Sequence, residues 1–258
     1  MIKRRIVSIL LVGLLLTGCQ SEEQEITISA AASLIDVLEE VIDLFEQEHP
    51  SIQVSVNLGG SGSLSQQIIQ GAPVDVFLSA SIDKFEQVRQ EGLMDEEFIE
   101  PLMMNKLVWI QAKDTSPLKS IEQINKLAIG TPETVPAGQY AKEAFTDSGI
   151  FTKLESKLVY TKDVRQVLQY VESENVDTGI VYQTDAKISD KVNINHELPL
   201  GEYDPIIYPV GILKNSQQKE AAKTFYQFLQ TEEVIELFKQ YGFLEVDGDI
   251  DGSIFSTN

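Results

Sequence analysis

Two serines stand where a predicted strand gives way to a predicted helix. Ser33 follows the apolar run at residues 26–30, and Ser61 follows the alternating run at residues 52–58, within the stretch NLGGSGSLSQQ. Backbone N–H groups in the first turn of a helix have no intrahelical acceptor, and the helix dipole favours negative charge there. The neighbouring glycines allow a ligand to approach the backbone closely. The pattern therefore indicates an anion site, with a plain helix cap at Ser33 and a flexible turn at Ser61 as the alternatives.

Catalytic interpretations of the same stretch fail on spacing. A dinucleotide fingerprint would need one more glycine, a phosphate-binding P-loop would need Gly-Lys, and a nucleophile elbow would need glycine where Ser63 stands. The chain has only two histidines, His49 and His196, and both are expected at the surface. We therefore expect a binding protein rather than an enzyme. A hydrolase using Ser33 or Ser61 is the alternative from another class, and a surface adhesin is a third.

The charge of the chain excludes several partners. The 258 residues are 43% apolar, enough for one large or two modest cores, and carry a net charge of −20. Three of the 20 basic residues precede residue 18 and no acid does, so the rest of the chain carries 17 bases against 40 acids. Such a surface repels nucleic acid and anionic lipid head groups, so neither is expected as a partner of the folded part.

The N-terminus has the pattern of a secretory signal. Residues 1–18 combine a basic start with an apolar run at 6–16, which is too short to span a bilayer. The ending Leu-Thr-Gly-Cys resembles the bacterial lipobox, which predicts a lipid on Cys19, the only cysteine. Residues 19–25 would form a polar spacer. We expect an extracytoplasmic protein anchored to the cell membrane; an ordinary signal peptide with a coincidental cysteine is the alternative.

Strands and helices alternate along the rest of the chain. Alternating or continuous apolar runs predict strands, and apolar residues recurring every three or four positions predict helices. Ser33, with an acid three residues later, is expected to cap the first helix. Strands are predicted at residues 26–30, 52–58, 74–80, 106–112, 127–130, 157–160, 178–181 and 206–213, and helices at 34–48, from about 63, and at 82–91, 138–148, 163–172, 217–229 and 232–241.

This order is typical of an α/β fold with two lobes, each a mainly parallel sheet flanked by helices. Lobe I is predicted to contain residues 26–105 and 207–243, and lobe II residues 106–206. A ligand would then lie between the lobes, at the carboxyl ends of the strands. Residues 244–258 are interpreted as an acidic tail. Their DGDIDG run resembles half of a calcium loop but lacks the glutamate and the helix that must follow.

Five motifs resemble those of the molybdate-binding proteins of bacterial ABC importers. In the order of that family they are AAASL from residue 30, GAPVDVFLSA from 71, PETVPAGQYA from 132, DVR from 163 and GIVYQTDA from 179. The resemblance implies a type II periplasmic-binding-protein fold that closes on molybdate or tungstate and delivers it to permease subunits. It implies a monomer without a cofactor and without a metal other than that of the oxyanion. Sulfate or another tetrahedral oxyanion is the alternative ligand.

The resemblance also implies which residues hold the anion. Molybdate is a dianion with four acceptor oxygens, so a selective site should present donors only. Ala137 and Val164 would donate backbone N–H groups, and the neighbouring Arg165 would support the loop without touching the ligand. The matching positions are Ser33 and Ser61 in lobe I and Ala137, Val164 and Tyr182 in lobe II.

Overall fold

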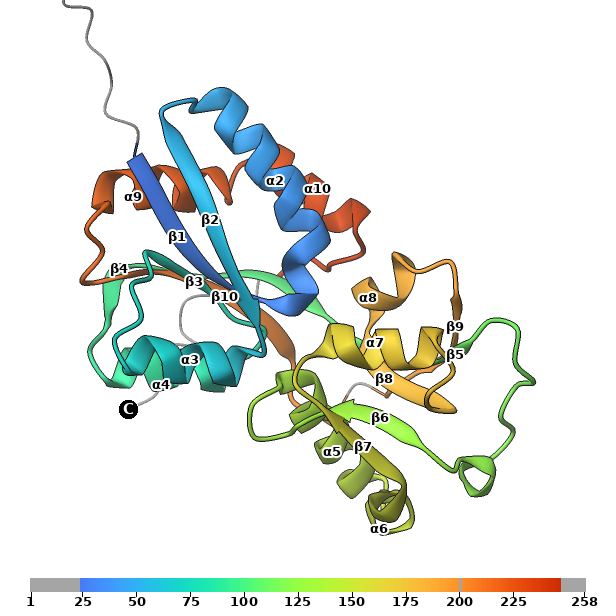
Figure 1. The fold of residues 1–258 in the computed structure, drawn as a ribbon. Helices are drawn as coiled ribbons and strands as arrows, with labels where there is room; N and C mark the ends of the chain where they lie inside the picture. The colour runs from blue at the N-terminus through green and yellow to red at the C-terminus, as the bar shows by residue number, and fades with distance from the viewer. Residues whose placement is uncertain (1–23, 200, 247–258) are drawn as a thin grey trace, which may run out of the picture.

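The computed structural model describes residues 24–199 and 201–246 and contains two five-stranded sheets, each flanked by helices (Figure 1). The predicted α/β fold with two lobes is confirmed. The predicted signal peptide, Cys19 and the DGDIDG run lie outside the described residues. The last two residues of the predicted spacer are already part of the first strand, where Gln24 pairs with Ile52.

Lobe I is built on a sheet with the strand order β2-β1-β3-β10-β4. Strand β1 pairs in parallel with β2 and β3, whereas β10 runs antiparallel to β3 and β4. Its elements are β1 (Gln24–Ala31), η2 (Ala32–Leu34), α2 (Ile35–Glu48), β2 (Ile52–Gly59), α3 (Ser61–Ile69), β3 (Val76–Leu78), α4 (Ile82–Gln90), β4 (Met94–Asn105), β10 (Ile206–Leu213), α9 (Lys219–Phe228) and α10 (Glu232–Gln240).

Lobe II repeats this plan with the strand order β7-β6-β8-β5-β9. Strands β7, β6 and β8 are parallel, and β5 is antiparallel to β8 and β9. Its elements are β5 (Leu107–Ala112), η3 (Ile121–Gln123), β6 (Leu127–Gly130), α5 (Pro136–Asp147), α6 (Phe151–Leu154), η4 (Glu155–Lys157), β7 (Leu158–Thr161), α7 (Val164–Glu172), β8 (Thr178–Tyr182), α8 (Gln183–Lys187) and β9 (Val192–Glu197).

The chain crosses between the lobes twice. It enters lobe II between Asn105 and Leu107, at the end of β4, and returns between Glu197 and Ile206, before β10. Leu244 pairs with Met104 through two backbone hydrogen bonds of 2.8 and 2.9 Å, so the segment after α10 packs against the first crossing. Every helix within the described ranges is too short or too polar to span a bilayer.

Apolar packing fixes the helices on the sheets. In α2 the buried positions Val37, Leu38, Val41 and Phe45 recur at helical spacing, as predicted. The Phe45 ring lies 5.0 Å from that of Phe225 in α9, edge to face. This contact holds α2 against α9 and so fixes the direction in which the N-terminal end of α2 points.

In lobe II, α5 lies against the end of β6 so closely that only glycine fits at one position. A β carbon on Gly138 would lie 1.9 Å from the carbonyl oxygen of Gly130, which is backbone and cannot rotate away. The contact holds the first turn of α5 at the carboxyl end of β6.

We expect Gly138→Ala to lower the free energy of unfolding by about 1–3 kcal/mol, as overpacking does, in urea denaturation followed by circular dichroism. The control is Gly59→Ala, whose β carbon would meet only the flexible Leu64 side chain, at 3.3 Å. Equal destabilisation by both variants would contradict the claim that the contact with β6 is the tight one.

Candidate functional site

Three helix N-termini from the two lobes meet at the junction between them, which we call the crevice. Gly60 is the N-cap of α3, and a β carbon placed on it would lie 2.7 Å from the Thr134 carbonyl oxygen and 3.2 Å from that of Lys162. Thr134 immediately precedes Val135, the N-cap of α5, and Lys162 precedes the N-cap of α7. A hydrogen bond of 3.0 Å from the Gly62 amide to the Thr134 carbonyl joins the lobes, which are therefore closed on each other.

The two residues expected to donate amides lie in these first turns. Ala137 is the second residue of α5, after Pro136, and Val164 is the first residue of α7; both are buried. The side chain of Asp163 caps α7 by accepting a hydrogen bond of 2.8 Å from the Gln166 amide. The Val164 amide takes no part in this bond. First-turn amides and the helix dipoles together supply partial positive charge without a cation.

Ser33 does not cap a helix, so the predicted capping box is wrong. The N-cap of α2 is Leu34, without a side-chain cap, and Ser33 lies in the preceding turn η2. Its buried hydroxyl lies 2.9 Å from the phenol oxygen of Tyr208, in β10. Asp36, the acid expected to complete the cap, forms an ion pair with Arg165. A tertiary contact has replaced the local one. No local pattern could indicate Tyr208, because the contact spans 175 positions.

Ser61 is the first residue of α3 and is fully buried, so the flexible-turn alternative does not apply. Its side-chain oxygen accepts a hydrogen bond of 2.9 Å from the Ala80 amide. Because a hydroxyl can accept and donate at the same time, this bond holds the side chain in place and leaves its proton for another acceptor.

Tyr182 ends β8, and its hydroxyl has no hydrogen-bond partner among the described residues, although the side chain is only 2% exposed. Burial raises the pKa of this phenol well above its ordinary value, so it remains a donor at neutral pH. Leaving a buried donor unpaired costs about 1–3 kcal/mol. The hydroxyl therefore indicates a place for an acceptor that the protein itself does not provide.

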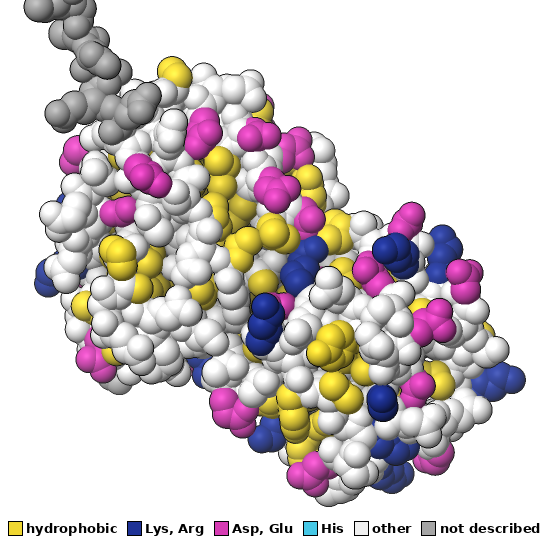
Figure 2. Space-filling model, in the orientation of Figure 1, with side chains coloured by type: hydrophobic (Ala, Val, Ile, Leu, Met, Phe, Trp, Pro, Cys, Tyr) yellow, Lys and Arg dark blue, Asp and Glu magenta, His cyan; other side chains and the backbone are white. Residues whose placement is uncertain are grey.

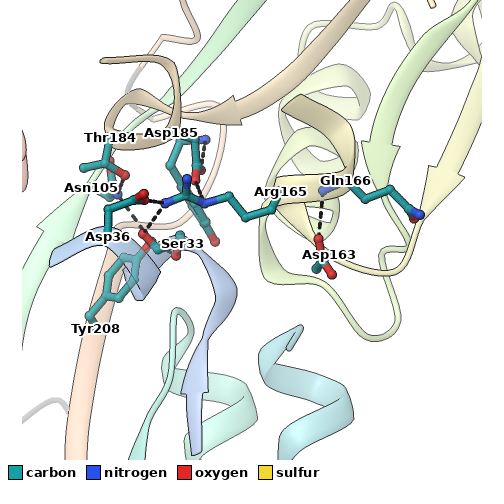
Figure 3. Close-up of polar contacts among 10 residues, drawn as sticks. Ser33, Asp36, Asn105, Asp163, Arg165, Gln166, Thr184, Asp185 and Tyr208 are labelled. Atoms are coloured by element: carbon teal, nitrogen blue, oxygen red, sulfur yellow. Dashed lines mark hydrogen bonds and ion pairs between the residues drawn. The ribbon is translucent and has the colours of Figure 1, made fainter. Parts of the chain in front are cut away.

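Arg165 joins the lobes beside these donors (Figure 3). From α7 it reaches into lobe I, where it contacts the Asp36 carboxylate and lies 3.4 Å from the Ser33 carbonyl oxygen. On its own lobe, its Nε lies 2.8 Å from Oδ1 of Asp185, as an ion pair outside hydrogen-bond geometry. Burial raises the pKa of Asp185 to about 7, against the opposing effect of Arg165.

Two carboxyl groups thus face the single guanidinium of Arg165. Its positive charge is directed to them, so an anion in the crevice would depend mainly on neutral hydroxyls and amides. Figure 2 shows Lys and Arg side chains at the junction of the lobes and acidic side chains spread over lobe I, so the acidic exterior extends close to the crevice.

The arrangement does not support hydrolysis. His49 follows α2 whereas Ser33 precedes it, so a helix of 14 residues, about 21 Å long, separates them. His196 lies on β9 against Trp109, with ring centres 5.5 Å apart. In the described part of the chain no three His, Cys, Asp or Glu side chains are grouped to hold a metal ion.

We expect Gly62→Ala to hinder closure, because the added β carbon would lie 2.8 Å from the Thr134 Cα of the other lobe. With molybdate, the anion that the motifs imply, small-angle X-ray scattering should show compaction of the parent protein but not of the variant. Gln66→Ala, on the exposed side of the same helix, is the control and should compact normally. Full compaction of Gly62→Ala would contradict the closed contact.

We expect Asp36→Asn to speed the release of bound molybdate by about two- to fivefold, the range of a partly exposed ion pair. The ligand-free protein should keep its free energy of unfolding, because the pair joins the lobes only when they close. Stopped-flow dissociation and urea denaturation measure the two quantities. Asp43→Asn removes a charge from an exposed position of the same helix; equal acceleration there would mean a general charge effect.

Comparison with known proteins agrees with this geometry. Residues 26–244 match the model of the family described as bacterial extracellular solute-binding protein. A Bacillus subtilis protein, YvgL, provisionally named an ABC transporter substrate-binding lipoprotein, is 43% identical over 89% of this chain and 93% of its own. The molybdate-binding protein ModA of Haemophilus influenzae is 34% identical over 85% of this chain and 89% of its own.

A solved structure shares the fold. The periplasmic molybdate-binding protein of Azotobacter vinelandii superposes with a TM-score of 0.77 at 22% identity, covering 86% of this chain and 100% of its own. The family match spans most of the sequence, and the relatives are transport proteins that bind substrates rather than enzymes. This chain belongs to the bacterial extracellular solute-binding proteins.

Proposed function

We propose that this protein captures molybdate, and also tungstate, outside the cytoplasm and delivers it to the permease subunits of an ABC importer. The observation that carries the proposal is the unpaired hydroxyl of Tyr182, buried beside Tyr208, the phenol that Ser33 contacts. The relatives named for molybdate support the choice of ligand.

The chemistry of the site favours a fully deprotonated anion. Ser61 has its oxygen occupied by the Ala80 amide, and Tyr182 is a protonated phenol, so both have a proton to donate. The amides of Ala137 and Val164 can only donate. Among these four groups only the weakly basic hydroxyl oxygen of Tyr182 could accept the proton of a protonated oxyanion, so such an anion should bind more weakly than a fully deprotonated one.

The number of donors suits a binding protein that must also release its ligand. The five named donors, at ~1.5–3 kcal/mol for each charge-assisted hydrogen bond, give a gross gain of about 8–15 kcal/mol. Dehydration of the anion and closure of the lobes reduce this gain. The remainder is compatible with the ~8–12 kcal/mol of micromolar to nanomolar binding.

Attachment to the membrane through a lipid on Cys19 is part of the proposal. The sequence Leu-Thr-Gly-Cys at the end of an apolar run supports it, and so does the lipoprotein name of the Bacillus relative. The attached protein would act as a monomer that carries the anion to its permease.

Calorimetric titration of the mature protein with molybdate, tungstate, sulfate and phosphate tests the proposal. Molybdate and tungstate should bind with dissociation constants of micromolar or lower, and phosphate should not bind. Ser33→Ala should weaken molybdate binding by about 10- to 150-fold, the value of a hydrogen bond to a charged partner. Uptake of sulfate as strong as that of molybdate would assign the protein to sulfate instead, and turnover of an ester abolished by Ser33→Ala would indicate a hydrolase.

A further inference from the structure

A backbone hydrogen bond fixes the orientation of the side-chain amide of Asn105. Its Oδ1 accepts a hydrogen bond of 2.9 Å from the Lys106 amide, which can only donate. The Nδ2 group must therefore face the other way, where it lies 3.0 Å from the Thr184 hydroxyl and 3.3 Å from the phenol oxygen of Tyr208. Flipping the amide would leave the Lys106 N–H without its acceptor.

The direction of this bond fixes the next one. Nδ2 of Asn105 is a donor only, so the oxygen of Tyr208 accepts. The proton of Tyr208 then needs an acceptor of its own, and the Ser33 oxygen lies 2.9 Å away. Burial raises the pKa of Tyr208, which keeps this proton on the phenol. The hydroxyl of Tyr182 is nearby but stands in no hydrogen-bond geometry to it.

The oxygen of Ser33 therefore accepts a hydrogen bond from the Tyr208 hydroxyl, and the proton of Ser33 remains available for another acceptor. We infer that Tyr208, oriented by Asn105, is a positioning residue that directs the hydroxyl proton of Ser33 into the anion site (Figure 3). The inference rests on the proposed function, since it needs an anion as the acceptor at the end of the chain. The bond from the Ala80 amide to Ser61 has the same effect on the second serine.

The three relay residues, Asn105, Tyr208 and Ser33, come from different parts of the fold. Asn105 ends β4 at the first crossing, Tyr208 lies on β10 just after the second, and Ser33 follows β1. The bond from Asn105 to Thr184 of α8 adds lobe II to the relay. Residues of the strands that connect the lobes thereby determine the direction in which the Ser33 hydroxyl donates.

Tyr208→Phe removes the relay and little else. The ring packs edge to face on Phe243 and on Tyr182, with centres 5.4 and 5.8 Å apart, and phenylalanine keeps both contacts. Without the phenol, the hydroxyl of Ser33 can rotate and present its oxygen to the ligand. We expect calorimetry to show molybdate binding weakened about three- to tenfold, as for the loss of one buried hydrogen bond.

A double-mutant cycle with Ser33→Ala separates this role from a general effect on the fold. If Tyr208 acts through the Ser33 hydroxyl, Tyr208→Phe should change molybdate affinity less than about twofold once that hydroxyl is absent. The control is Tyr203→Phe, another buried tyrosine near the crossings, whose hydroxyl accepts from the Leu107 amide at 3.3 Å. Tyr203→Phe should change molybdate affinity by the same factor whether or not the Ser33 hydroxyl is present.

Two results would overturn the inference, and they differ. Equal loss from Tyr208→Phe in the presence and absence of the Ser33 hydroxyl, in a parent protein that binds molybdate, would refute the relay and leave the proposed function standing. A parent protein that binds none of molybdate, tungstate and sulfate would refute the proposed function, and the relay with it.

Discussion

An N–H group in the first turn of a helix must face either water or an acceptor outside the helix, and the crevice of this protein gathers several such groups from both lobes. Strand β2 leads into α3, β6 into α5, and β7 into α7, so each helix begins at the carboxyl end of a parallel strand. The close contacts of Gly60 with residues that precede α5 and α7 bring the three beginnings together. An anion that accepts hydrogen bonds from these amides would therefore stabilise the closed arrangement of the lobes.

This arrangement would allow a strongly acidic protein to hold the proposed dianion. The net charge of −20 belongs to the chain as a whole, whereas the potential in the crevice is set by dipoles within a few ångströms. Arg165 adds little free positive charge, because Asp36 and Asp185 both contact it. Its contacts with Asp36 and Ser33 instead join the two lobes, so under the proposed function they would link capture of the anion to closure.

The sequence predicted the elements with strong apolar patterns and missed those without them. Strands β4 and β9 were not predicted; both lie at sheet edges, where one side of the backbone lacks a partner strand. The β4 sequence MDEEFIEPLMMN contains four acids and a proline, which an edge strand tolerates but which hides the apolar alternation. Helix α7 was predicted, over residues 163–172, because its apolar pattern is local; the structure makes Asp163 its N-cap.

The site was predicted unevenly for the same reason. The glycine turn and Ser61 could be placed because their position at the start of a helix follows from a strand, a turn and a helix in succession. The neighbours of Ser33 could not, because Tyr208 and Asn105 reach it only through the folding of the two crossings. A helix cap was one local interpretation of Ser33, and in the structure its hydroxyl contacts the distant phenol of Tyr208 instead.

The most direct test of the central claim is a crystal structure of the mature protein with molybdate, with the anion located by anomalous scattering from molybdenum. We expect the anion between the lobes, within hydrogen-bond distance of the hydroxyls of Ser33, Ser61 and Tyr182 and of the amides of Ala137 and Val164. Molybdenum bound through lysine or arginine side chains, or lying outside the crevice, would contradict it.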